Sequence, residues 1–268
     1  MSETAERAAP SAIRFRGGGF APQPGRYSAW LAFATALILW QAVCQLGWVS
    51  PLFLPSPARI AAALWRLMVT GELWPHLWAS LYRIVGGWAV GTAAGLAIGL
   101  AMGIFSTARA AGIPIVSALF PIPKIALLPL LILWFGIGEP SKIATIALGV
   151  FFPTVIAAYS GVDGVPRNLV RMAQSFEVPV AAIVWKVILP GAMPAILAGF
   201  RISAATALLL VVSAEMIGAE TGLGAFVLQA GNLMQTDQLL AGVLVLSLLG
   251  LVIGRAITAL ERRLLRWR

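Results

Sequence analysis

The chain has 268 residues, of which 60% are hydrophobic and only 11% are charged. A soluble domain carries roughly a quarter charged residues, so this chain has too few to cover a surface that faces water. The composition therefore excludes an ordinary soluble protein. It predicts an all-α membrane protein with about six transmembrane helices, formed by a single domain over residues 28–268.

The formal charge of +9 raises the question of a nucleic-acid partner. The positive charges fall mostly at the ends of apolar runs, and no basic helix or aromatic-interleaved patch accompanies them. We therefore interpret them as topology signals and expect no nucleic acid. Cys44 stands alone, which excludes an intrachain disulfide, and His76 has no second ligand nearby, so we expect no metal site.

The N-terminal quarter contains a tail, a first span and a surface segment. Residues 1–27 are polar and rich in glycine and proline, which predicts a disordered cytoplasmic tail. Residues 28–48 are apolar over a length that crosses a bilayer. In the outer segment 49–73, Ser56-Pro57 predicts a helix start and Gly71 its end. The apolar residues of this short helix share one face, which predicts a helix lying on the membrane surface: Ile60, Ala63, Leu64, Leu67 and Met68.

Five glycines mark the second predicted span, residues 77–105. They recur every four residues, which places them on one stripe where another helix can approach closely. We assign this stripe to helix packing: Gly87, Gly91, Gly95, Gly99 and Gly103.

Prolines mark the third predicted span, residues 111–137. Its four prolines each remove a backbone donor and disfavour a straight helix, and broken helices at membrane depth are tolerated next to protein or a wet cavity. We therefore expect a broken helix near a pathway. An outer turn at 138–141 then leads to three further spans at residues 143–159, 193–217 and 239–260.

The longest internal hydrophilic stretch is residues 161–190. With six spans, this stretch, Arg109 and the arginines at both ends of the chain share one side of the membrane, which predicts that both termini are cytoplasmic. Pro166 and Pro179 predict two short helices separated by a turn, and Val170, Ala173 and Phe176 present a small apolar knob. Two interpretations stay open: a helix that docks into a partner, and a loop packed on its own bundle.

No G-x-x-x-x-G-K-[ST] phosphate loop is present, so the chain does not bind ATP in that way. Glu215 is the only acidic residue well inside a predicted span, which is thin support for coupling to an ion gradient. An ion-driven secondary carrier or channel therefore stands as the alternative to a transporter that takes its energy from a partner.

The hydrophilic stretch resembles the coupling loop of permease subunits of binding-protein-dependent ABC importers. That loop has Glu-Ala-Ala, three residues, Gly, and a later Leu-Pro. The chain keeps the pattern at Ala173, Gln174, Ser175, Phe176, Leu189 and Pro190. It departs from the pattern at Arg171, Met172 and Glu177, where the family has Glu, Ala and the glycine of a sharp turn.

Further stretches between Pro51 and Trp267 resemble the taurine, aliphatic sulfonate and nitrate type of these permeases. They are residues 52–57, 127–130, 134–139, 141–143, 214–216 and 222–224. The resemblance implies the type I importer permease fold in the bacterial inner membrane. It also implies a second permease copy, a cytoplasmic ATPase dimer that binds ATP and magnesium, and an extracytoplasmic solute-binding protein. The chain itself would then hold no cofactor and would not be an enzyme.

Four charged residues within predicted spans are candidates for a substrate pathway, because charges there are costly and require a partner. Three cations against one carboxylate favour an anion in transit. The alternative is structural, with Arg201 and Glu215 paired to neighbouring helices and Arg83 extended outward. The four candidates are Arg83, Lys124, Arg201 and Glu215.

Overall fold

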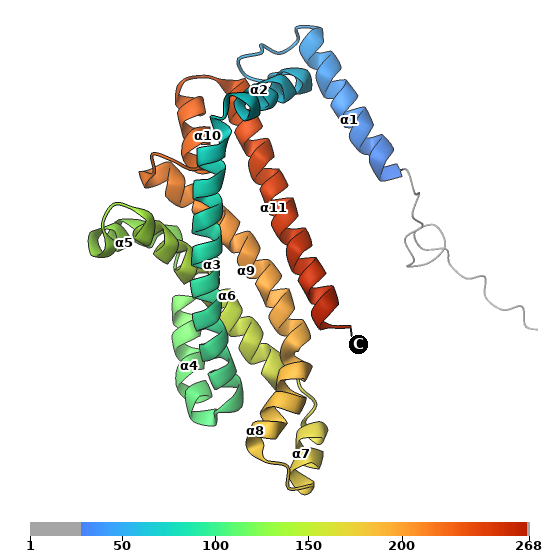
Figure 1. The fold of residues 1–268 in the computed structure, drawn as a ribbon, viewed down its shortest axis with the longest axis vertical. Coiled ribbons are helices and arrows are strands. Elements are labelled where there is room, and N and C mark those ends of the chain that lie inside the picture. The colour runs from blue at the N-terminus through green and yellow to red at the C-terminus, as the bar shows by residue number, and fades with distance from the viewer. Residues whose placement is uncertain (1–27, 267–268) are drawn as a thin grey trace, which may run out of the picture.

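The computed structural model describes residues 28–266, and within this range it contains helices and no strand. The predicted tail, residues 1–27, lies outside the described residues. The helices, labelled in Figure 1, are α1 (Ser28–Gln45), α2 (Pro57–Thr70), α3 (Leu73–Ile104), α4 (Ser106–Leu119), η1 (Lys124–Leu127), α5 (Leu128–Phe135), α6 (Glu139–Asp163), α7 (Arg167–Ser175), α8 (Val180–Ile183), η2 (Val184–Ile188), α9 (Leu189–Gly218), α10 (Leu223–Asn232) and α11 (Thr236–Leu264).

Four of the described helical segments are long and apolar enough to cross a membrane: α3, α6, the continuous segment Val180–Gly218, and α11. The bent pair of α4 with η1 and α5 makes a fifth, and α1 adds a further apolar helix, Trp30–Gln45 among the described residues. The long helices lie side by side, with α2 and α10 at one end and α7 and α8 at the other (Figure 1). The all-α membrane architecture is confirmed.

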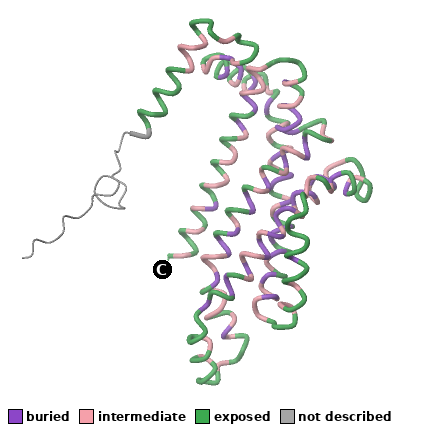
Figure 2. The backbone as a smooth tube through the Cα atoms, turned by 180° about the vertical axis from the view of Figure 1, so that it is seen from behind, coloured by how far each residue is buried: buried purple, intermediate pink, exposed green. Residues whose placement is uncertain are grey.

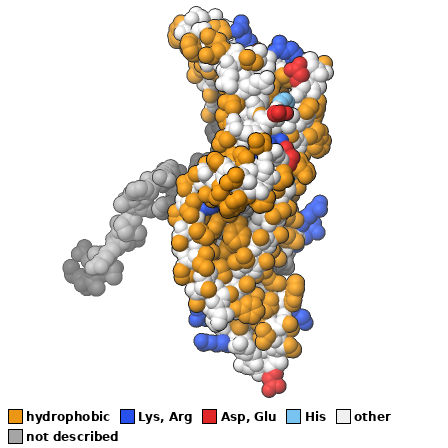
Figure 3. Space-filling view, turned by 90° about the vertical axis from the view of Figure 1, so that its left-hand side faces the viewer, with side chains coloured by type: hydrophobic (Ala, Val, Ile, Leu, Met, Phe, Trp, Pro, Cys, Tyr) orange, Lys and Arg blue, Asp and Glu red, His pale blue; other side chains and the backbone are white. Residues whose placement is uncertain are grey.

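Burial follows this arrangement. Figure 2 shows buried residues concentrated where the long helices face one another, whereas residues 30–39 of α1 are all exposed. On the face drawn in Figure 3, hydrophobic side chains cover most of the middle of the bundle, and many charged side chains lie toward its two ends, with basic side chains also at mid-height. An apolar middle of this kind suits lipid as the solvent.

The predicted third span is broken, as its prolines indicated. The axes of Ser106–Leu119 and Lys124–Phe135 meet at 87°. Pro121 and Pro123 fall in the break, and Pro129 lies in the first turn of α5, where its missing N–H is tolerated. Pro114 lies inside α4 without ending that helix.

Two predicted boundaries were wrong. The turn expected at 138–141 is the start of α6, which begins at Glu139 and carries Pro140 in its first turn. The second short helix expected after Pro179 is not separate, because α8, η2 and α9 form one segment. Pro190 has no N–H to donate to the turn before it, and η2, a π-helical turn directly upstream, accommodates this defect without ending the helix.

Helix α2 begins and ends where the sequence predicted, with Ser56 Oγ accepting from the Arg59 N–H and Gly71 in a left-handed conformation at φ +85°. Its expected place on the membrane surface stays a prediction, but its apolar face is covered by protein. The apolar face, represented by Ile60 and Leu67, is buried against α3, α10 and α11. Periodicity defines an apolar face, but protein and lipid can both cover it.

The glycine stripe of α3 faces α6. A Cβ on Gly87 would come within 2.6 Å of the Ile146 side chain, and one on Gly95 within 2.7 Å of the Phe151 carbonyl oxygen. Cβ atoms on the other three glycines, Gly91, Gly99 and Gly103, would likewise overlap α6 atoms. The two helices therefore pack with backbones in close approach over about five turns.

Candidate functional site

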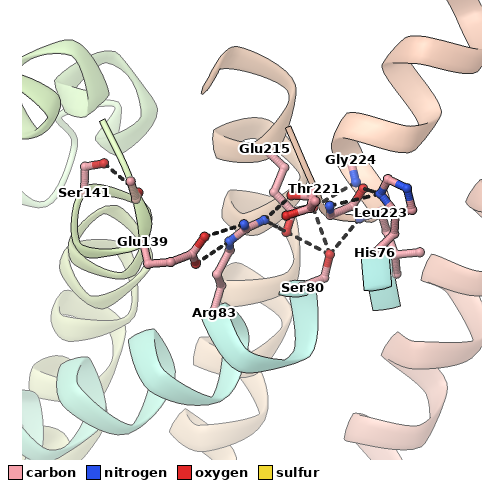
Figure 4. A network of polar contacts seen from close by, with 11 residues as sticks. His76, Ser80, Arg83, Glu139, Ser141, Glu215, Thr221, Leu223 and Gly224 are labelled. Atoms are coloured by element: carbon pink, nitrogen blue, oxygen red, sulfur yellow. Dashed lines mark hydrogen bonds and ion pairs between the residues drawn. The ribbon is translucent and has the colours of Figure 1, made fainter. Parts of the chain in front are cut away.

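Arg83 lies at the centre of a buried ion network near the α2–α10 end of the bundle (Figure 4). Its side chain does not extend outward, since the residue is 1% exposed. Nε and Nη2 donate to the two carboxylate oxygens of Glu139 at 2.7 and 2.6 Å, a paired geometry that arginine and carboxylate favour. Nη1 donates to Glu215 Oε1 at 2.8 Å and to the Thr221 carbonyl at 2.6 Å.

Glu215 closes the network from α9. Its oxygens accept from Ser80 Oγ at 2.8 and 2.9 Å and from the Gly224 N–H at 2.8 Å. Ser80 Oγ in turn accepts from the Leu223 N–H at 2.8 Å. Two unpaired N–H groups at the start of α10 are thus satisfied by side chains of α9 and α3, and the carboxylate lies at the favourable end of the α10 dipole.

Gly222 precedes α10 at φ +134°, a conformation that side chains rarely adopt. A Cβ there would lie 2.6 Å from Arg83 Nη1 and would also overlap the Glu215 carboxylate. The Gly222–Leu223–Gly224 stretch therefore has a physical role: it brings the backbone against the ion network. The network joins α3, α6, α9 and the start of α10.

Sequence reasoning missed three members of this network: Ser80, Glu139 and the Thr221 carbonyl. Glu139 was expected in an outer turn, and Arg83 and Glu139 are 56 residues apart. The charge of Arg83 was a usable clue. A cation inside a span requires a carboxylate at the same depth, so Arg83 implies an acidic partner on a neighbouring helix. The sequence contains several carboxylates near that end, and Arg83 pairs with two of them, Glu139 and Glu215.

Lys124 caps the break between α4 and α5. Its ammonium group donates to the carbonyl oxygens of Leu119, Phe120 and Ile122 at 2.8, 2.8 and 2.6 Å. It also lies 4.5 Å from the centre of the Phe152 ring. All three N–H donors are thus occupied by the protein, and the positive charge remains at the edge of a groove.

That groove, which we call the Lys124 groove, has a volume of about 710 Å³ and lies between α6, α9 and the α4–α5 break. Its walls are mostly apolar, and they include Phe152, Gly199, Ile202 and Leu210. The structure does not bring the four candidate pathway residues together. Lys124 lies at this groove, Arg83 and Glu215 lie in the buried network, and Arg201 is half-exposed and ion-paired with Glu261 of α11.

The coupling-loop residues form a projecting end of the molecule. Helix α7 carries Arg171 to Ser175, and its exposed apolar side chains are Leu169 and Met172, with Phe176 directly after the helix. This exposed face differs from the expected one, because Val170 packs inward against the buried cluster formed by α6 and α9. Leu189 and Pro190 lie apart from α7, in the first turn of α9.

Glu177 replaces the expected glycine and nevertheless adopts the left-handed conformation, at φ +56°. The Val178 N–H donates to the Ala173 carbonyl at 3.1 Å, and the Glu177 N–H donates to the Gln174 carbonyl at 2.9 Å. This pair of bonds is a Schellman helix ending, and Pro179 follows it. The sharp turn survives without glycine, at a conformational cost of about 1 kcal/mol.

Comparison with known proteins identifies the family of this chain. Residues 91–266 match the family described as the inner-membrane component of binding-protein-dependent transport systems. The taurine transport system permease TauC of Escherichia coli is 40% identical over 239 residues, 87% of each chain. The putative aliphatic sulfonates transport permease SsuC of Escherichia coli is 38% identical over 242 residues, 90% of this chain and 92% of the relative.

Solved structures agree at the level of the fold. A chain of the inward-facing MetNI methionine ABC transporter superposes with a TM-score of 0.63 and 21% identity, covering 70% of this chain and 93% of that one. The expected type I importer permease fold is confirmed. With the family match and relatives aligned along nearly the whole chain, this protein belongs to the inner-membrane components of binding-protein-dependent transport systems, the permease subunits of ABC importers.

Proposed function

We propose that this permease carries a small sulfonate-like anion, of the taurine and alkanesulfonate class, delivered by an extracytoplasmic binding protein. The observation that carries the proposal is the pair of relatives TauC and SsuC, each aligned over nearly nine tenths of the chain. We infer that the Lys124 groove lines the path, closed by a second copy of the chain. Because the donors of Lys124 are occupied, its charge would attract an anion through space rather than by a direct hydrogen bond.

Energy would come from a cytoplasmic ATPase pair that binds ATP and magnesium, with α7 docked into a groove of that partner. Support comes from the exposed apolar face of α7, where Met172 is 55% and Phe176 is 76% exposed, flanked by the exposed Arg167 and Arg171. A short helix with an apolar face and charged flanks suits docking into a groove. This role puts α7 in the cytoplasm, and both chain termini would lie on the same side.

The docking role is tested by co-purification of the tagged chain with its candidate ATPase partner. Phe176→Asp and Ala173→Glu are expected to release the ATPase. The matched control is Phe53→Asp, which changes an equally exposed phenylalanine, 77%, in the segment between α1 and α2. Equal retention by all variants would refute docking through α7.

The substrate class is tested by ATP-dependent uptake into proteoliposomes that contain the permease, the ATPase and the binding protein. Labelled taurine, a longer alkanesulfonate and nitrate are compared, and we expect the sulfonates to be taken up. Lys124→Gln should reduce sulfonate flux, whereas Lys124→Arg should retain it. Uptake without ATP would instead favour the ion-driven carrier.

A further inference from the structure

A second groove, of about 840 Å³, opens between α9 and α11 on the outside of the bundle. We call it the arginine groove, because Arg201, Arg255 and Arg262 line it. Arg201 is ion-paired with Glu261. Arg255 and Arg262 are exposed, and neither has an ion-pair partner among residues 28–266. Two arginines without an ion-pair partner among these residues, in a groove between apolar helices, suit an anionic ligand.

The groove changes character along its length. From Gly250 to Arg262 it follows about 18 Å of α11, at a rise of 1.5 Å per residue. The end near Gly250 and Leu251 is apolar, and Gly254 leaves it hollow, since a Cβ there would meet no atom within 4 Å. The other end, toward Arg262, is cationic. An apolar channel that leads to a pair of arginines matches a molecule with a chain and an anionic head.

The surroundings narrow the choice of occupant. Helix α11 runs beside α9 at the edge of the bundle (Figure 1), and its exposed side chains include the large apolar residues Leu248, Val252 and Leu260. In a membrane this face meets lipid. A second copy binding through the same groove would bring the arginines of the two chains toward each other, which disfavours a symmetric contact.

We propose that the arginine groove binds one anionic phospholipid. Arg255 and Arg262 hold its phosphate group, and an acyl chain lies along Gly250 and Gly254. Basic pockets between transmembrane helices are a known mode of anionic headgroup recognition. This site is separate from the proposed transport path, since none of its residues lines the Lys124 groove.

The test is native mass spectrometry of the full chain in detergent, titrated with dioleoyl phosphatidylglycerol or with phosphatidylcholine of the same chains. Arg255→Gln/Arg262→Gln is compared with Arg263→Gln/Arg266→Gln, which removes the same charge from the same end of α11 but outside the groove. Gly254→Leu fills the groove without changing any charge, and the helix tolerates leucine.

We expect phosphatidylglycerol to bind more tightly than phosphatidylcholine. The Arg255/Arg262 variant should weaken its binding about tenfold to thirtyfold, at roughly one charge contact per arginine. Gly254→Leu should weaken it as well, and the Arg263/Arg266 variant should leave it nearly unchanged. Equal losses in both arginine pairs, equal binding of both lipids, full binding to Gly254→Leu, or competition by soluble glycerol phosphate would each overturn the proposal.

Discussion

Replacing Glu215 with glutamine is expected to destabilise the bundle far more than the same change at Glu139. The Glu215 side chain is fully buried, and its oxygens accept from Arg83, Ser80 and the Gly224 N–H. A glutamine amide would direct N–H donors at groups that are themselves donors, and would leave part of the arginine charge uncompensated. Breaking a buried pair from one side costs about 3–5 kcal/mol. Glu139 is 43% exposed, so water screens its carboxylate, and a glutamine there keeps one acceptor for the buried Arg83 donors, so the cost is about 1–2 kcal/mol.

The assay is the free energy of unfolding in mixed micelles, from titration with sodium dodecyl sulfate and a spectroscopic measure of helix content. Arg83→Met/Glu215→Met removes both charges and is expected to lose less than Glu215→Gln alone, because no unpaired charge remains. If Glu139→Gln is as destabilising as Glu215→Gln, the ion network does not stabilise the bundle in the way its burial indicates.

Three further outcomes are expected. Gly91→Ala should cost about 1–3 kcal/mol in the same unfolding titration, because its Cβ would overlap the backbone of Ala147, whereas Gly86→Ala on the same helix should be tolerated, with 3.6 Å to the nearest atom. Glu177→Gly should slow hydrogen exchange of the last α7 amides about fivefold by removing about 1 kcal/mol of backbone strain; unchanged exchange would refute this. Lys124→Met should broaden spin-label distances between α4 and α5, because three carbonyls lose their donor, and Lys124→Arg should preserve them.

Features governed by local rules could be predicted from the sequence. The cap at Ser56 and the end at Gly71 depend on single residues, and the break of the third span follows from prolines that cannot donate. The glycine stripe requires only that glycines recur at helical spacing. Each of these features depends on residues of a single segment, so it could be predicted without knowing which helix packs against that segment.

Features that depend on contacts between different helices could not be predicted from the sequence. Arg83 meets Glu215 across 132 residues, and the position of one cation within a span does not identify the carboxylate that faces it. The apolar face of α2 could be predicted from the sequence, but periodicity does not distinguish protein from lipid as its cover. Helix α10 was missed because its ten residues lie between two spans, and its first N–H groups are capped by side chains of other helices rather than by its own N-cap.

The continuous helical segment Val180–Gly218 connects the α7 end of the bundle with the end that holds the ion network. Its 39 residues span about 58 Å, so a tilt of about 3° around the middle displaces each end by roughly 1.5 Å. One end adjoins the α7 turn, and the other is fastened through Glu215 to three neighbouring helices. Because these contacts hold the far end, we expect a displacement at the α7 end to move the joined helices together. The π-helical turn at Val184–Ile188, followed by Pro190 and Pro194, is where this segment departs from a regular α-helix.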